Sequence, residues 1–187
     1  MARFSLRPRA LRLALCLVAW ALSACDGGPR NVDAELEARL TPIREAGTRL
    51  SGGSKGERAA TQWTAWLVGG EPALIEEVVQ IEEWGTTTSL YVFEDGGLTF
   101  YRQTGQRPTG VLGGVGLQEV ALELRWEGDE MVAGAKSVNR EVVEVPEWEA
   151  AVARERARDL RALVIDRARG QGEVGAGSAG SKAETSP

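Results

Sequence analysis

Residues 117–127, Leu-Gln-Glu-Val-Ala-Leu-Glu-Leu-Arg-Trp-Glu, form the clearest alternation of apolar and polar side chains in this chain. Successive side chains of a β-strand point to opposite faces, so this pattern predicts a strand with one apolar and one polar face. The expected apolar face consists of Val120, Leu122, Leu124 and Trp126. The segment therefore predicts a sheet that has a covered face.

The segments that follow predict two more short strands and a long helix. Gly128-Asp129 indicates a turn into a strand over 131–137, and Asn139-Arg140 separates this strand from another over 142–145. Pro146, with glutamates directly after it, is typical of a helix N-terminus, and a helix is predicted over 147–169, ending at Gly170. Its expected buried stripe consists of Trp148, Val152, Ala153, Ala157, Leu160, Val164 and Ala168.

Upstream, the pattern predicts a series of hairpins. Strands are expected over 73–84, 90–94 and 98–104, and Asp95-Gly96-Gly97 joins the last two. Alternation within the first of them sends Glu76 and Glu77 to opposite faces of the sheet, so this doublet forms no carboxylate pair. Residues 59–68 fit both a strand and a helix, and the turn after them favours a strand.

These elements predict one α+β domain, an antiparallel β-meander of about 5–7 strands with an N-terminal and a long C-terminal helix packed against it. Residues 61–169 form this domain. The N-terminal helical segment spans 32–50, where Pro42 either kinks the helix or opens a second one. Composition predicts a flexible joint over 51–60, a mobile connection or the flexible lip of a binding groove over 105–116, and a disordered tail over 170–187.

The first 24 residues have the features of an export signal. Four arginines precede an apolar run over 13–22, which is too short to span a bilayer. Leu22-Ser23-Ala24-Cys25 follows this run and resembles the lipobox of bacterial lipoproteins at all four positions. A secretory leader cut at an Ala-x-Ala-like site and an uncleaved anchor are the alternatives.

The resemblance implies cleavage between Ala24 and Cys25, a diacylglycerol on the cysteine thiol and acylation of the new amino group. Two or more acyl chains hold a protein stably on a membrane. Residues 25–31 would then be a lipidated tether on the periplasmic side. Asp26 follows the cysteine, which in enteric members of the family favours the inner over the outer membrane.

The composition excludes several kinds of chemistry. The chain has no histidine, and its two cysteines are Cys16 in the leader and the proposed lipid site Cys25. Ser-His-Asp and Cys-His catalysis and histidine-based zinc sites are therefore excluded. Without the four leader arginines, 18 basic residues face 27 acidic ones, a net charge of −9 that disfavours binding to nucleic acid.

The sequence thus predicts a lipid-anchored envelope protein without a cofactor, a non-catalytic binding or accessory module that contacts another envelope protein. A carrier of a small apolar ligand or lipid and a glycan hydrolase that uses carboxylates alone are the alternatives. The candidate binding surface combines aromatic residues with arginines spaced along one face of the C-terminal helix: Trp63, Trp66, Tyr91, Tyr101, Arg154, Arg158 and Arg161.

Overall fold

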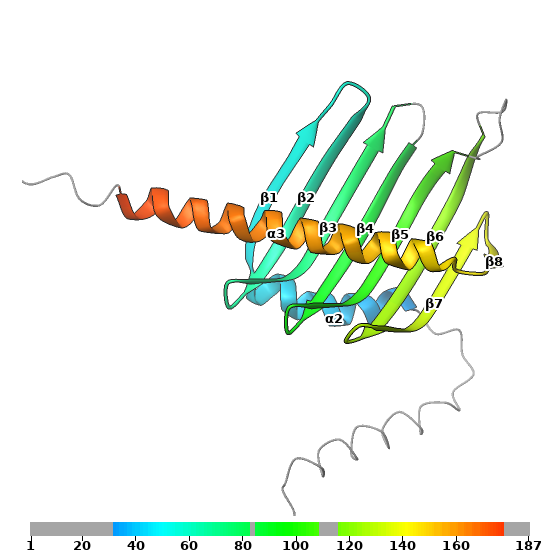
Figure 1. Ribbon diagram of the computed structural model, residues 1–187, viewed down its shortest axis with the longest axis horizontal. Helices are drawn as coiled ribbons and strands as arrows, with labels where there is room; N and C mark the ends of the chain where they lie inside the picture. The colour runs from blue at the N-terminus through cyan, green and yellow to red at the C-terminus, as the bar shows by residue number, and fades with distance from the viewer. Residues whose placement is uncertain (1–31, 83–84, 109–115, 178–187) are drawn as a thin grey trace, which may run out of the picture. The chain divides into compact units, whose positions relative to one another are not determined.

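The computed structural model describes residues 32–82, 85–108 and 116–177 (Figure 1). The chain divides into two compact units, residues 1–37 and 38–187. The described part of the first unit is the beginning of helix α2 (Val32–Ala46). The leader, the lipobox and the tether of the sequence analysis lie outside the described residues, as do residues 109–115 and most of the predicted tail.

The described residues of the second unit form an eight-stranded antiparallel sheet whose strands follow one another in sequence order. This confirms the predicted α+β class, with eight strands instead of 5–7. The strands are β1 (Thr48–Lys55), β2 (Ala59–Val68), β3 (Glu71–Ile81), β4 (Gly85–Glu94), β5 (Gly97–Pro108), β6 (Leu117–Glu127), β7 (Glu130–Val138) and β8 (Glu141–Val143). Helix α3 (Glu147–Gly177) crosses the strands on one face (Figure 1).

The face under α3 holds the main hydrophobic core. The apolar residues predicted for 117–127 all lie there, and Leu122, Leu124 and Trp126 pack with Ala153, Ala157, Leu160 and Val164 of α3. Val120 is buried as well. Side chains alternate between the two faces with a period of two. The face that α3 covers therefore determines which side chains of each neighbouring strand are buried.

The opposite face is contacted by the part of α2 that belongs to the second unit. Arg44 of α2 forms an ion pair with Glu76 at 2.6 Å, and its guanidinium lies 5.7 Å from the ring centroid of Trp66. Trp66 begins a row of paired, buried residues that runs across the sheet through Leu74, Val92 and Phe100. Side chains on both faces of the central strands are therefore removed from water.

The predicted flexible joint over 51–60 is wrong, because most of this segment is strand β1 and the start of β2. The glycines of this segment serve packing: a Cβ on Gly52 would lie 2.3 Å from the Trp63 ring. The N-terminal helix accordingly ends at Ala46, not at residue 50. It is one continuous helix that contains Pro42.

We expect Gly52→Ala to destabilise the domain by about 1–3 kcal/mol, since the buried Trp63 ring must move. The matched control is Gly170→Ala, where a Cβ meets nothing within 4 Å. In this helical position alanine should stabilise the protein by about 0.5–1 kcal/mol. Denaturant unfolding of both variants measures these changes, and an unaffected Gly52→Ala protein would contradict the packing role of Gly52.

Helix α3 continues past Gly170, where the sequence analysis ended it, as far as Gly177. A glycine inside a helix costs only about 1 kcal/mol relative to alanine, which is too little to stop a helix of this length. No helix in the described part of the chain is long and apolar enough to cross a membrane.

Candidate functional site

The four aromatic residues predicted to form a binding surface are buried in the structure, and this part of the prediction is wrong. Trp63, Tyr91 and Tyr101 belong to the core under α3, and Trp66 lies under Arg44 on the other face. The rings of Tyr91 and Tyr101 pack with their centroids 5.1 Å apart. All four come from central parts of strands that a helix covers, which is why none of them forms an exposed surface.

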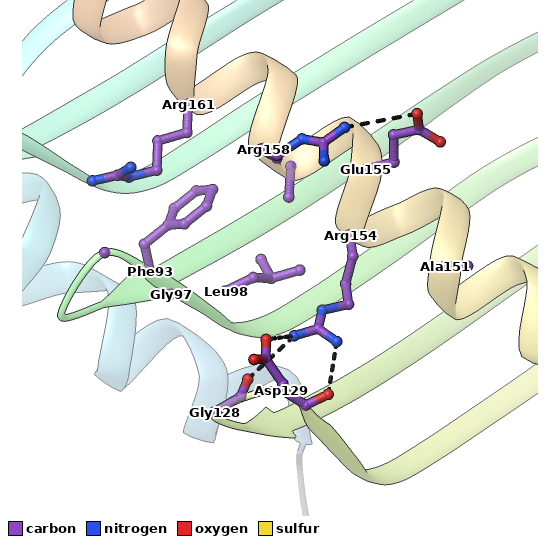
Figure 2. A pocket seen from close by; sticks show the side chains of 12 residues that line it. Phe93, Gly97, Leu98, Gly128, Asp129, Ala151, Arg154, Glu155, Arg158 and Arg161 are labelled. Carbon is purple, nitrogen blue, oxygen red and sulfur yellow. Dashed lines mark hydrogen bonds and ion pairs between the residues drawn. The ribbon is translucent and has the colours of Figure 1, made fainter.

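The three predicted arginines line one cavity of about 620 Å³ beside α3 (Figure 2). Its wall contains Phe93 and Leu98, and its rim includes the turns at Gly96-Gly97 and Gly128-Asp129. Asp95 and Gly96 both have positive φ, as the predicted tight hairpin requires. The helical spacing of the three arginines thus places all of them beside the same cavity, as predicted.

Each of these arginines already has a carboxylate partner. Arg154 donates to the backbone oxygen of Asp129 at 2.7 Å and to the Asp129 carboxylate (Figure 2). Arg161 donates to Glu71 at 2.6 Å, and the exposed Arg158 lies 3.8 Å from Glu155. Arg161 Nε is buried without a hydrogen-bond partner, but the positive charge of the three arginines is otherwise balanced locally, so their predicted role in binding stays a prediction.

A second group of charged side chains lies between the sheet and the N-terminal half of α3 and includes two buried carboxylates. Glu77 is only 2% exposed, and its carboxylate accepts hydrogen bonds from the Tyr91 hydroxyl at 2.9 Å and from Arg156 Nε at 3.1 Å. Glu76, its neighbour, binds Arg44 on the other face. The predicted separation of this doublet is confirmed, and each glutamate binds one of the two helices.

Glu149, in the first turn of α3, is the other buried carboxylate of this region, at 4% exposure. Its Oε1 accepts from Lys136 Nζ at 2.8 Å and lies 3.4 Å from Arg107 Nη1. Its Oε2 is buried and has no hydrogen-bond partner. A buried carboxylate oxygen without a partner is costly, so this atom marks a place where the fold leaves hydrogen-bonding capacity unused.

These charged groups lie at the inner end of an open groove. A cavity of about 210 Å³ between Glu77 and Glu149 adjoins one of about 490 Å³, and both are lined by Val79, Arg107, Trp148 and Glu149. The larger cavity adds apolar and neutral polar side chains to the lining: Ile81, Pro108, Val120, Thr87, Gln106 and Gln118. We call the two cavities together the Trp148 groove.

Two residues of the predicted buried stripe of α3 are instead exposed at this groove. Trp148 is 61% exposed and Val152 is 55% exposed, whereas Ala153, Ala157, Leu160 and Val164 are buried as predicted. Trp148 and Val152 lie one turn apart at the start of the helix, beside the groove, where they lack a covering neighbour. An exposed tryptophan next to an open cavity is typical of a binding site.

The tyrosines beneath the groove give a test of this buried arrangement. Burial raises the pKa of Tyr91 far above its ordinary value, with the negative charge of Glu77 adding to the effect, and burial also raises the pKa of Tyr101. Each folded pKa lies above the unfolded value of about 10, so the folded state keeps protons that the unfolded chain releases. Stability is therefore unaffected below pH ~10 and falls as the pH rises above it.

We expect no tyrosinate absorbance near pH 10 in the folded protein, because these are the only two tyrosines of the sequence. The signal should appear only at a higher pH, together with the loss of near-ultraviolet circular dichroism. In denaturant, both tyrosines should titrate near pH ~10. Titration of either tyrosine at that pH in the folded protein would contradict the buried arrangement.

The groove also bears on the hydrolase alternative. It holds two carboxylates, as a glycan hydrolase requires, but each is bound by cationic side chains. A glycan hydrolase needs two carboxyl groups placed to act on the glycosidic bond, whereas each of these carboxylates is already engaged in ion pairs within the protein. Among the described residues, no group of three or more acidic or thiol side chains is arranged to hold a metal ion.

Sequence reasoning missed the residues that form the inner end of the groove, although a signal existed for one of them. Glu77 falls between Ile75 and Val79 on the apolar face of its strand, and a charged residue there predicts a buried partner. Nothing comparable marks Arg107, Lys136 or Glu149, which come from three separate elements.

No protein-family model, curated protein or solved structure matches the chain.

Proposed function

We propose that this protein is a non-catalytic binding module that a lipid anchor holds on the periplasmic face of a bacterial membrane. The anchor follows from Leu22-Ser23-Ala24-Cys25 and the leader before it, with Cys25 as the lipidated residue and the inner membrane favoured by Asp26. The binding site is the Trp148 groove. Its ligand is a component of the cell envelope, where a tethered domain meets its target at high effective concentration.

The observation that carries this proposal is the exposure of Trp148 beside a groove with an unpartnered, buried carboxylate oxygen. The domain buries Trp63, Trp66 and Trp126 almost completely, so leaving Trp148 in water is a specific departure from its packing. Exposed aromatic side chains next to unsatisfied polar groups favour ligand binding because both gain free energy on contact.

A carrier of a small apolar ligand is the second candidate. The apolar residues Val79, Ile81, Pro108 and Val120 of the groove support it. The charged inner end argues against it, because an apolar ligand would remove water from Lys136, Arg107 and Glu149 without replacing the lost hydrogen bonds. The hydrolase alternative has the least support, for the reason given above.

Hydroxyl-radical footprinting tests the proposal. In isolated envelope membranes we expect Trp148 to be protected from oxidation relative to the purified protein in detergent, because its ligand covers the indole. Leu163 is the matched reference, since it lies on the same helix and is 49% exposed. Its oxidation should be equal in both samples. Equal oxidation of Trp148 in the two samples would contradict the proposal.

A further inference from the structure

We infer that the ligand of the Trp148 groove is a saccharide whose adjacent hydroxyl groups bind at Glu149 and Lys136 and whose ring lies against Trp148. This inference rests on the proposed function and adds the chemical class of the ligand. It depends on three features of the groove: the free acceptor at its inner end, the donors next to that acceptor, and the exposed indole at its mouth.

The free acceptor requires a ligand group that donates a hydrogen bond. Glu149 Oε2 is that acceptor, and it belongs to a carboxylate whose other oxygen is already bound by Lys136. Hydroxyl, amide and ammonium groups all qualify as donors. The charges around the site distinguish between these donors. The lining has three cationic residues and two carboxylates, which leaves one excess positive charge: Arg107, Lys136 and Arg156 against Glu77 and Glu149. An ammonium group is therefore disfavoured.

The position of the donors separates adjacent hydroxyl groups from a peptide backbone. Lys136 Nζ is 2.8 Å from Glu149 Oε1, so a cationic donor and the carboxylate that carries the free acceptor line the same cavity. Two neighbouring hydroxyls of one ring can use both, one donating to Oε2 and the other accepting from the ammonium. The N–H and C=O of one planar trans peptide unit point in opposite directions and cannot reach two adjacent groups together.

The rest of the groove matches the two sides of a sugar ring. Trp148 offers a flat apolar surface for the C–H groups of the ring. Thr87, Gln106 and Gln118 offer neutral side chains that both donate and accept hydrogen bonds, as further hydroxyls require. The larger cavity, about 490 Å³, falls within the range of about 300–1,000 Å³ for small-molecule sites.

The test is fluorine NMR on the full mature lipoprotein in nanodiscs, with 5-fluorotryptophan at every tryptophan. The resonance of Trp148 is assigned as the one that Trp148→Ala removes. The probes are neutral tetrasaccharides of glucose, galactose, mannose and N-acetylglucosamine, together with a capped apolar tetrapeptide and hexanoate. We expect at least one tetrasaccharide to shift the Trp148 resonance at concentrations up to about 10 mM, the range of weak binding.

Two variants examine the roles of the residues, with isothermal titration calorimetry as the readout. Glu149→Gln and Trp148→Ala should each weaken binding of the active tetrasaccharide at least about tenfold, as loss of a central contact does. Leu163→Ala, on the same helix but outside the groove, should leave binding unchanged. Thermal unfolding of each variant shows whether the fold is intact, and Trp148→Ala, which removes an exposed side chain, keeps the test informative if Glu149→Gln does not fold.

A shift by the tetrapeptide or by hexanoate without any shift by the sugars would overturn the saccharide inference while the proposed binding function stands. Absence of every shift would overturn it as well. Unchanged sugar binding by both variants would show that the sugar binds elsewhere and would also contradict it. The footprint of Trp148 in envelope membranes decides the proposed function separately, because that measurement does not depend on the class of ligand.

Discussion

Replacing Arg156 with alanine is expected to lower the free energy of unfolding by about 1.5–3 kcal/mol. Without Arg156, the Glu77 carboxylate, which is 2% exposed, keeps only the hydrogen bond from the Tyr91 hydroxyl among the contacts described above. A buried charge without its counter-charge is among the most destabilising defects in a folded protein. Urea unfolding measures the change.

Arg158→Ala is the matched control for this variant. Arg158 lies on the same helix, half a turn away, but its side chain is 75% exposed against 45% for Arg156, and its ion pairs are with exposed carboxylates at 3.7–3.8 Å instead of a buried one. Its removal should change stability by no more than about 0.5 kcal/mol. The triple variant Glu77→Met, Arg156→Met, Tyr91→Phe should recover much of the lost stability. Equal, small effects of Arg156→Ala and Arg158→Ala would contradict the structural role of the Glu77 ion pair.

Replacing Cys25 with serine is expected to abolish membrane attachment. The proposed anchor depends on a thioether at this sulfur, and a serine hydroxyl does not replace it in the lipidation reaction of the family that the leader resembles. The chain without acyl chains and without the leader carries a net charge of −9, which gives it no electrostatic attraction to anionic membranes. In cells grown with labelled palmitate, the variant should carry no label and should leave the membrane pellet.

Asp26→Asn is a suitable control for the lipidation measurement, because it keeps the cysteine and changes only the residue after it. This variant should take up palmitate and sediment with membranes as the parent does. If Cys25→Ser protein remained labelled and membrane-bound, the lipoprotein interpretation would be wrong, and an uncleaved apolar anchor would be the better account of the leader.

The fold was predictable where the alternation of side chains was regular. Residues 117–127 indicated the correct strand and its correct buried face because half of their side chains pack under one helix. Strand β1 escaped prediction because its glycines and serines resemble a linker, whereas Gly52 is needed to make room for Trp63. The structure of that segment depends on a contact between two strands, and the local composition gives no sign of such a contact.

The candidate site was less predictable than the fold. The arginines of α3 lie together as their spacing required, but the carboxylate partners of Arg154 and Arg161 come from a turn and a strand distant in the sequence. The Trp148 groove depends on strand ends that bring Arg107, Lys136 and Glu149 together. A helical period predicted Trp148 to be buried, because periodicity identifies an apolar face without showing where the covering sheet residues end.

The most direct test of the whole account is photo-crosslinking in living cells. A photoreactive amino acid replaces Val152 at the groove in one strain and Leu163 in another, two positions of similar exposure on the same helix. The account predicts a crosslinked product between the anchored protein and an envelope component from position 152 and none from position 163. Equal products from both positions, or no product from position 152, would contradict it.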